Sequence, residues 1–156
     1  MEKFIENLDR ASKNLQTADH MLYMTYPIVK EKRLLLKILN EVNTVVLSIV
    51  NAILQYEYLY KRIDLYKDAK ANFQIFKEKC APRYKISKEQ VIKIIEIFNL
   101  AEKHKKSPFE FVKDDKIVIM TNSFRTDIVN VEKMKEYIFT SKDLLRKADS
   151  IIRNRM

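Results

Sequence analysis

Residues 42–54 read VNTVVLSIVNAIL, and this segment decides the fold. It is apolar nearly all round a helix and lies in a proline-free stretch from roughly Glu31 to Lys61. A helix with apolar residues on every side is one that neighbouring helices contact from several directions. The sequence therefore predicts a long second helix over this stretch, at the centre of a helical bundle.

The segments on either side have narrower apolar stripes, as expected for the outer helices of a bundle. Apolar residues recur there at spacings of four and three, which places them on one helix face. The stripes predict a first helix from about Glu2 to Thr25, ended at Tyr26 by Pro27, and a third helix capped by Asp64 and ended by Pro82. The inward residues are Phe4, Leu8, Ala11, Leu15, Ala18 and Leu22 in the first helix, and Leu65, Ala69, Phe73, Phe76 and Cys80 in the third.

Two capping sequences define the helices of the C-terminal half. Ser87, followed three residues later by Gln90, forms a capping box, so a fourth helix is expected from Lys88 to about Lys105. Asn130 is a suitable N-cap for a fifth helix. The inward residues of this last helix, again at spacings of four and three, are Met134, Ile138, Ser141, Leu145, Ala148 and Ile152.

A short β structure is expected between these two helices. Residues 116–121, KIVIMT, are the only strand-like segment, β-branched and bounded by Asp, Asn and Ser residues. Residues 126–131 can pair back as the second strand of a hairpin. Because the chain has no glycine, we expect a longer connection over residues 122–125 instead of a two-residue turn.

Together these elements predict an all-α fold, an up-down bundle of about five helices with a small β-hairpin between the fourth and the fifth. A chain of 156 residues that is 47% hydrophobic has enough apolar material for one core. We therefore expect residues 1–156 to form a single helical-bundle domain.

The absence of glycine also excludes several catalytic motifs. The P-loop, the dinucleotide-binding fingerprint, the nucleophile elbow and the GxxG clamp all need glycine for close backbone approach or positive φ. One cysteine, Cys80, and two histidines, His20 and His104, are too few for a multi-thiolate zinc site or a three-histidine metal site. His104 lies among three lysines and is expected to be a loop histidine before a catalytic one. We expect no metal and no cofactor, and the sequence names no catalytic residue.

The net charge is +9, and most of the excess lies in the second half of the chain. The first interpretation is a solvated lysine-rich face, and the alternative is a surface that attracts anionic partners, here RNA or an acidic protein. The candidate residues are Lys77, Lys79, Arg83, Lys85 and Lys88, joined by Lys103, Lys105 and Lys106 if the ends of the third and fourth helices meet.

A row of uncharged polar residues runs along the central helix at spacings of three and four, so its members share one face. Three interpretations are open. The row faces solvent, or it hydrogen-bonds to other residues of the same chain, or it is the surface on which a second subunit docks. A polar row in an apolar helix is a known way to set helix register and partner choice, and this favours a homodimer. The residues are Asn40, Thr44, Ser48, Asn51 and Gln55.

Tyrosines gather beside Lys61 and Arg62, just after the apolar part of the central helix. Aromatic rings beside cations can stack nucleic-acid bases. Positions two apart on a helix point in different directions, however, so these rings are expected to pack at the edge of the core. They are Tyr56, Tyr58, Tyr60 and Tyr66.

The N-terminal segment does not read as a secretory signal, because it carries acidic residues and no continuous apolar stretch follows. The most apolar stretch, residues 45–54, is about half the length that a bilayer requires. We therefore expect a cytoplasmic protein without membrane contact.

Residues 18–20, ADH, in the first helix and residues 52–57, AILQYE, at the end of the second resemble HEPN-type domains, which are compact helical bundles of this length. The resemblance covers residues 1–60 by pattern and the rest by architecture, and it implies dimerisation. Active members of that family are metal-independent endoribonucleases in which an Arg is followed four to six residues later by a His. This motif is absent, because Arg10 is too far before His20 and residues 98–100 before His104 are Phe, Asn and Leu. The resemblance therefore implies a non-catalytic role near RNA or a partner protein.

The sequence thus favours a non-catalytic binding or interaction module that self-associates and contacts RNA or another anionic partner through a basic surface. The alternative is an RNA-directed hydrolase, HEPN-like or of another kind, whose site is assembled only in three dimensions. Residues distant in the sequence would have to meet to form it.

Overall fold

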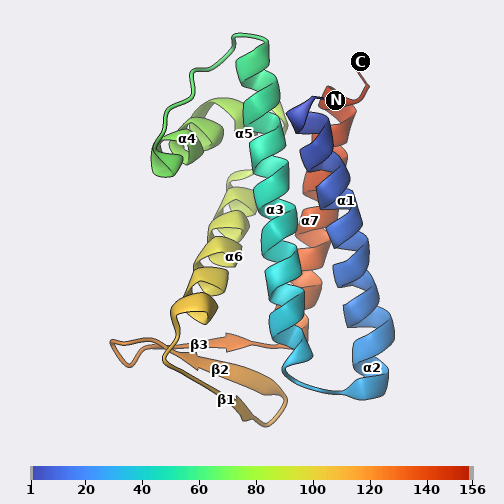
Figure 1. Ribbon diagram of the computed structural model, residues 1–156, viewed down its shortest axis with the longest axis vertical. Helices are drawn as coiled ribbons and strands as arrows, with labels where there is room; N and C mark the ends of the chain where they lie inside the picture. The colour runs from blue at the N-terminus through green and yellow to red at the C-terminus, as the bar shows by residue number, and fades with distance from the viewer. Residues whose placement is uncertain (1, 155–156) are drawn as a thin grey trace.

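The computed structural model describes residues 2–154 as an up-down bundle of four long helices with a small sheet at one end (Figure 1). The long helices are α1 (Lys3–His20), α3 (Leu34–Leu59), α6 (Lys88–Lys106) and α7 (Val131–Ile152). A shorter, interrupted helix that begins with α4 (Ala69–Ile75) lies at the other end, beside the end of α3 (Figure 1). The predicted all-α class, with a small β element before the last helix, is confirmed.

α3 is the central helix, as its sequence predicts. It packs against α1, α6 and α7, and buried residues occur around its circumference from Leu35 to Glu57. Within residues 2–154, α3 is also the one helix that is long and apolar enough to cross a membrane by length and composition, and 56% of its apolar window is buried inside the protein. That burial is typical of a core helix.

The two prolines that are predicted to end helices do not end them. Each lies just after a π-helical turn: Met21–Thr25 precedes α2 (Tyr26–Val29), and Phe76–Cys80 precedes α5 (Ala81–Arg83). In an α-helix a proline ring collides with the carbonyl of residue i−4. A π turn is wider and bonds to residue i+5, as when Tyr26 N–H donates to Met21 O. The first helical run therefore continues past Pro27 to Val29, where the sequence predicts an end at Tyr26, and the second ends at Arg83, one residue after the predicted stop at Pro82.

The third helix begins later than the sequence predicts. Asp68, not Asp64, is the N-cap of α4, and its carboxylate accepts a hydrogen bond from the backbone N–H two residues later (3.1 Å). In the preceding loop the Asn72 side chain bonds both the N–H and the C=O of Tyr66, each at 2.8 Å. Those bonds take the backbone groups that a helix would use, so Leu65 lies in the loop.

The predicted caps of the last two long helices are confirmed. Ser87 and Gln90 form the capping box of α6, with both reciprocal bonds at 3.1 Å. Asn130 caps α7 by accepting a hydrogen bond from Lys133 N–H (2.8 Å). The inward residues predicted for α7 are buried, apart from a half-buried Leu145.

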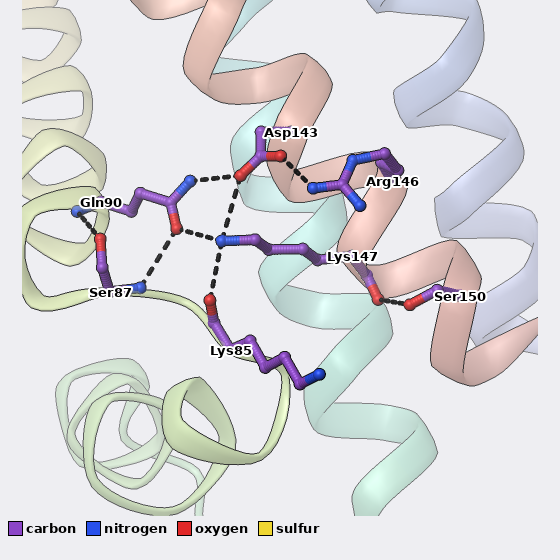
Figure 2. Close-up of polar contacts among 7 residues, drawn as sticks. All are labelled: Lys85, Ser87, Gln90, Asp143, Arg146, Lys147 and Ser150. Atoms are coloured by element: carbon purple, nitrogen blue, oxygen red, sulfur yellow. Dashed lines mark hydrogen bonds and ion pairs between the residues drawn. The ribbon is translucent and has the colours of Figure 1, made fainter.

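Gln90 also links α6 to α7 (Figure 2). Its amide nitrogen donates to Asp143 (2.6 Å), and its amide oxygen accepts from Lys147 (2.7 Å). Lys147 also donates to the backbone carbonyl of Lys85 (2.7 Å). Burial alone would raise the pKa of Asp143, but hydrogen bonds from neighbouring side chains, Arg146 first among them, lower it from 3.8 to about 2. The network ties the loop before α6 to the last helix.

The β element of the described chain is a three-stranded antiparallel sheet, formed in order by β1 (Phe109–Lys113), β2 (Lys116–Met120) and β3 (Thr126–Val129). The hairpin of β2 and β3 is confirmed, with the longer connection that the sequence predicts. The prediction of a single hairpin is incomplete, because β1 pairs with β2 through a two-residue turn between Lys113 and Lys116. Asp114 adopts the left-handed backbone conformation there (φ 57°), so this tight turn forms without glycine.

Candidate binding surfaces

An open groove runs between α3 and α6. The part beside α4 has a volume of about 530 Å³, and the part toward the sheet has a volume of about 480 Å³. Leu47 of α3 and Phe98 of α6 line both parts, so the two adjoin. We call this opening the α3–α6 groove.

At the groove, one side of the central helix α3 is not covered by other helices. Leu47 is 46% exposed, although it lies in the middle of α3 between the buried residues Val46 and Ser48. An apolar side chain left half-exposed at the centre of a bundle marks a side on which the core is not closed.

The part of the groove beside α4 is apolar with a basic rim. Val50 and Leu54 of α3 line it together with Phe73 and Phe98, whose ring centroids are 5.8 Å apart. The ammonium group of Lys77 lies 5.7 Å from the centroid of the Phe73 ring. This part therefore suits an apolar group with negative charge beside it.

The part toward the sheet is polar. The amides of Asn40 and Asn43 line it from α3, and His104 lines it from the last turn of α6. His104 Nδ1 lies 2.5 Å from Oε2 of Glu110 on β1, and these side chains are 21% and 17% exposed. A carboxylate on one ring nitrogen fixes the orientation of an imidazole and leaves the other nitrogen for a ligand or a proton. His104 is thus a helix residue with a carboxylate partner, and the prediction of a loop histidine is wrong.

The predicted polar row divides between the groove and the interior. Asn40 and Asn51 line the groove. Ser48 is buried, Gln55 accepts a hydrogen bond from an α1 side chain (2.8 Å), and Thr44 donates to a backbone carbonyl of its own helix (3.1 Å). Two of the five residues therefore reach the groove, and the other three lie inside the fold or bond within the chain.

The predicted basic residues form two groups at opposite ends of α6. One group is Lys77, Lys79, Arg83, Lys85 and Lys88, and the other is Lys103, Lys105 and Lys106. At 1.5 Å per residue, Lys88 and Lys103 are about 22 Å apart along the helix. The structure therefore keeps Lys88 and Lys103 apart, although one member of each group, Lys77 and Lys105, lines the α3–α6 groove.

Several of these cations already have acidic partners. The ion pairs are Lys103 with Asp127 (2.6 Å), Lys106 with Glu102 (2.8 Å) and Arg83 with Glu57 (2.8 Å). Lys77 and Lys105 line the groove. Lys79, Lys85 and Lys88 are exposed, and their ammonium groups form no ion pair within the described part of the chain. The group at the N-terminal end of α6 thus keeps more of its charge.

Sequence reasoning missed a buried ionic cluster at the end of α3. Glu57 is 1% exposed, and its carboxylate lies 3.1 Å from Arg62 and 2.8 Å from Arg83. The hydroxyl of Tyr84 also donates to it (3.2 Å). Burial, and then the charge of Glu57, raises the pKa of Cys80 to about 12, so this thiol is protonated at neutral pH and is a poor nucleophile. A glutamate within a strongly apolar helix was the one signal in the sequence that pointed to such a cluster.

The tyrosines at the end of α3 separate into one buried and three exposed rings. Tyr56 is 3% exposed, which confirms the prediction of packing at the edge of the core. Tyr58 and Tyr60 are each 53% exposed, and Tyr66 is 60% exposed. Tyr60 still packs at the edge of the core, because its ring lies 4.8 Å from that of Tyr56. For Tyr58, in the last turn of α3, and for Tyr66, in the loop that follows, the prediction is wrong, because both rings are mainly in contact with solvent.

Among residues 2–154, no group of three His, Cys, Asp or Glu side chains is placed to hold a metal ion. Comparison of the chain with protein-family models, with curated proteins and with solved structures finds no match. The function is therefore inferred from the chemistry of the surfaces described above.

Proposed function

We propose that the protein is a non-catalytic interaction module that forms a homodimer through the α3–α6 groove. The observation that carries this proposal is the half-exposed Leu47 at the middle of the central helix, within a groove that Asn40 and Asn51 also line. Apolar area supplies the free energy of association, and the amides fix the register of the two copies.

Two-fold symmetry doubles the effect of each groove residue. Fully burying a leucine side chain contributes roughly 1.5–3 kcal/mol, so covering the exposed half of Leu47 contributes about 1 kcal/mol in each copy. In a two-fold dimer the same patch is covered on both subunits. The groove surfaces of Phe73 and Phe98 add further apolar area on each side.

The net charge of +9 opposes association of two copies at low ionic strength. Added salt screens this repulsion, so dimerisation through an apolar groove strengthens with salt. Binding of an anionic partner has the opposite salt dependence. The same surplus of positive charge supports RNA or an acidic protein as the partner of the dimer.

Multi-angle light scattering tests the proposal. We expect the wild-type chain to show the mass of two 18.7 kDa subunits, and Leu47→Glu to show the mass of one. Asn51→Leu removes a register-setting amide and should change the oligomeric state or lower the solubility. Ile92→Glu is the matched control, since Ile92 is 57% exposed on α6 but does not line the groove. A monomeric wild-type chain at high salt would contradict the proposal.

A second candidate function is RNA hydrolysis, which the pairing of His104 with Glu110 favours. A histidine held by a carboxylate at the wall of a groove has the arrangement of a general base. The nearby amides of Asn40 and Asn43 supply hydrogen-bond donors for a bound phosphate.

Incubation with labelled RNA separates the two functions. Cleavage that survives metal chelation and disappears in His104→Ala would support the hydrolase. Glu110→Gln should then also lower the cleavage rate while leaving the mass of the dimer unchanged. Intact RNA after long incubation, with a dimeric protein, supports the interaction module.

A further inference from the structure

A separate hollow of about 530 Å³ lies where α3 ends. It shares no lining residue with the α3–α6 groove. We call it the α3-end hollow, and its lining consists of Tyr58, Leu59, Lys61, Arg62, Ile63, Asp64 and Lys79.

Positive charge predominates in the α3-end hollow. Lys61 and Lys79 are exposed, and within residues 2–154 neither forms an ion pair. Arg62 is the third cation, and Asp64 is the acidic residue of the described lining. The lining therefore attracts anions at neutral pH.

The charge of Arg62 is only partly neutralised. Arg62 and Arg83 share the single carboxylate of Glu57, so these three residues keep a net positive charge. The Glu57 side chain is 2% exposed, whereas the two arginine side chains are 34% and 31% exposed. The cluster thus keeps its negative charge in the interior together with the Nε and Nη2 atoms of Arg83, while Arg62 is its cation in the lining of the hollow.

Exposed aromatic rings flank these cations. Tyr58 lines the hollow and is 53% exposed. Tyr60 is equally exposed and lies against Tyr56, with ring centroids 4.8 Å apart. The Arg62 guanidinium lies 5.4 Å from the Tyr60 ring centroid. Aromatic rings beside cations are what a protein needs to stack bases while neutralising phosphates.

The backbone around the hollow is fixed before any ligand binds. Lys61 adopts the left-handed conformation (φ 60°), and its N–H donates to Tyr58 O (3.0 Å). Arg62 N–H donates to Glu57 O (2.9 Å), which completes a Schellman motif at the end of α3. Ile63 is 7% exposed and anchors the loop in the core. A fixed frame reduces the conformational entropy that is lost on binding.

We propose that the α3-end hollow binds single-stranded nucleic acid, with Lys61, Arg62 and Lys79 against the phosphates and the exposed ring of Tyr58 against a base. The stacking surfaces favour a single strand, because bases paired in a duplex do not present their faces to a protein. This site goes beyond the proposed dimerisation and does not depend on it.

Fluorescence anisotropy with a labelled oligouridylate of about ten nucleotides tests the site. We expect binding that weakens with salt. The double variant Lys61→Ala, Lys79→Ala should lose at least tenfold in affinity and have a shallower salt dependence. Tyr58→Leu keeps an apolar side chain but removes the ring, and it should lose about tenfold, the typical effect of one stacked base.

Two matched controls test whether the loss of affinity is specific to residues of the α3-end hollow. Lys113→Ala removes an exposed lysine of β1, and Phe124→Ala removes an aromatic ring that is 81% exposed after β2. Both should bind like the wild-type chain. Lys61→Gly is a second charge-removing variant that suits the observed backbone conformation, so it keeps the test valid if the double variant misfolds.

Competition with the labelled oligouridylate identifies the class of ligand that the α3-end hollow binds. Displacement by unlabelled oligouridylate or oligodeoxyuridylate, but not by duplex RNA or polyglutamate, supports the site, and a preference between the first two, which carry the same base, identifies the sugar. Equal displacement by duplex RNA or by polyglutamate would overturn it, as would wild-type affinity in both Tyr58→Leu and the lysine variants. Light scattering on the same samples should show an unchanged mass, so failure of this site is distinguishable from failure of the dimer.

Discussion

Lys147 on α7 donates a hydrogen bond at 2.7 Å to the side-chain oxygen of Gln90, and the same oxygen accepts the N–H of Ser87 at the start of α6 (Figure 2). One ammonium group thereby reaches the first turn of α6, the carboxylate of Asp143 and the carbonyl of Lys85. The cap of one helix is thus completed by a charge from another, and this explains why the N-terminus of α6 is held against α7.

Lys147→Met should lower the free energy of unfolding by about 2 kcal/mol, because it removes the donor to three acceptors. The Lys147 side chain is 18% exposed, so water replaces it poorly. Urea unfolding followed by circular dichroism measures the change. Lys88→Met, an exposed lysine of the same region, is the control and should stay within about 0.5 kcal/mol of the wild-type value. Equal stability of the two variants would show that the network contributes little.

Asp143 should make stability depend on pH in the acid range. Its pKa falls from 3.8 to about 2 in the folded chain, so its contribution is fully present above pH 3.8 and is lost as the pH falls toward 2. The contribution is on the order of 2 kcal/mol. Unfolding of wild type and Asp143→Asn, compared at pH 5 and at pH 2.5, isolates it. The difference between the two proteins should shrink at the lower pH, and a constant difference would contradict the pKa shift.

Glu57→Gln should destabilise the chain by about 3 kcal/mol, since it leaves Arg62 and Arg83 without the buried charge that both contact. Glu102→Gln is the matched control. Glu102 pairs with Lys106 on the surface of α6, with a side chain that is 54% exposed, and such exposed pairs contribute little to stability. Thermal unfolding of the two variants should therefore differ by several degrees.

Cys80 should serve as a probe of global unfolding. Its side chain is fully buried and burial raises its pKa to about 12, so Ellman's reagent should label it only when the core opens. Labelling rates in increasing urea should follow the unfolding equilibrium. A variant with Cys80→Ala and Ser123→Cys, which moves the thiol to an exposed connection, should label at once. Fast labelling of the native wild-type chain would mean that the end of the bundle near Cys80 opens locally.

Lys85→Gly should stabilise the protein by about 0.5–1 kcal/mol. Lys85 has φ 59°, a conformation that glycine adopts without steric cost, and Lys147 bonds to its backbone carbonyl, which the variant keeps. Lys37→Gly removes the same charge from an exposed position within α3 and should destabilise by about 1 kcal/mol. Opposite shifts in melting temperature are the expected result, and a loss of stability in both variants would contradict it.

The central helix and both caps could be predicted because their signals are local. The apolar circumference of residues 42–54 requires neighbours on all sides, and Ser87 with Gln90 satisfies its own backbone groups wherever the helix lies. The π turns before Pro27 and Pro82 leave no such local signal. They depend on how the surrounding chain packs, and a proline alone predicts a stop.

β1 was missed because its pairing requires a turn that the composition disfavours. Without glycine a two-residue connection is unexpected, and it is Asp114 that supplies the left-handed residue. Aspartate tolerates this conformation better than most residues do. Glu110 lies on that strand, so its meeting with His104 could not be predicted either.

The candidate surfaces were predicted least well, since they are products of tertiary structure. Glu57 and Arg83 are distant in the sequence, and only the fold brings them to 2.8 Å. The α3–α6 groove arises from the relative positions of two helices, which helical periodicity does not encode. Asn40 and Asn51 of the polar row line the groove, but nothing in the spacing of the row indicated that Gln55 would hydrogen-bond to a side chain of α1.

Three helical segments of the described chain are followed within two residues by a lysine with positive φ: Lys30 (54°), Lys61 (60°) and Lys85 (59°). Each adds a positive charge near the end of a helix, where the partial charge of the helix dipole is negative. Electrostatic attraction thereby offsets part of the steric cost that glycine would have avoided. Helix ends of this kind are stabilised partly by charge, so high ionic strength or acetylation of these lysines should destabilise them. Helix ends closed by glycine should not respond to either treatment.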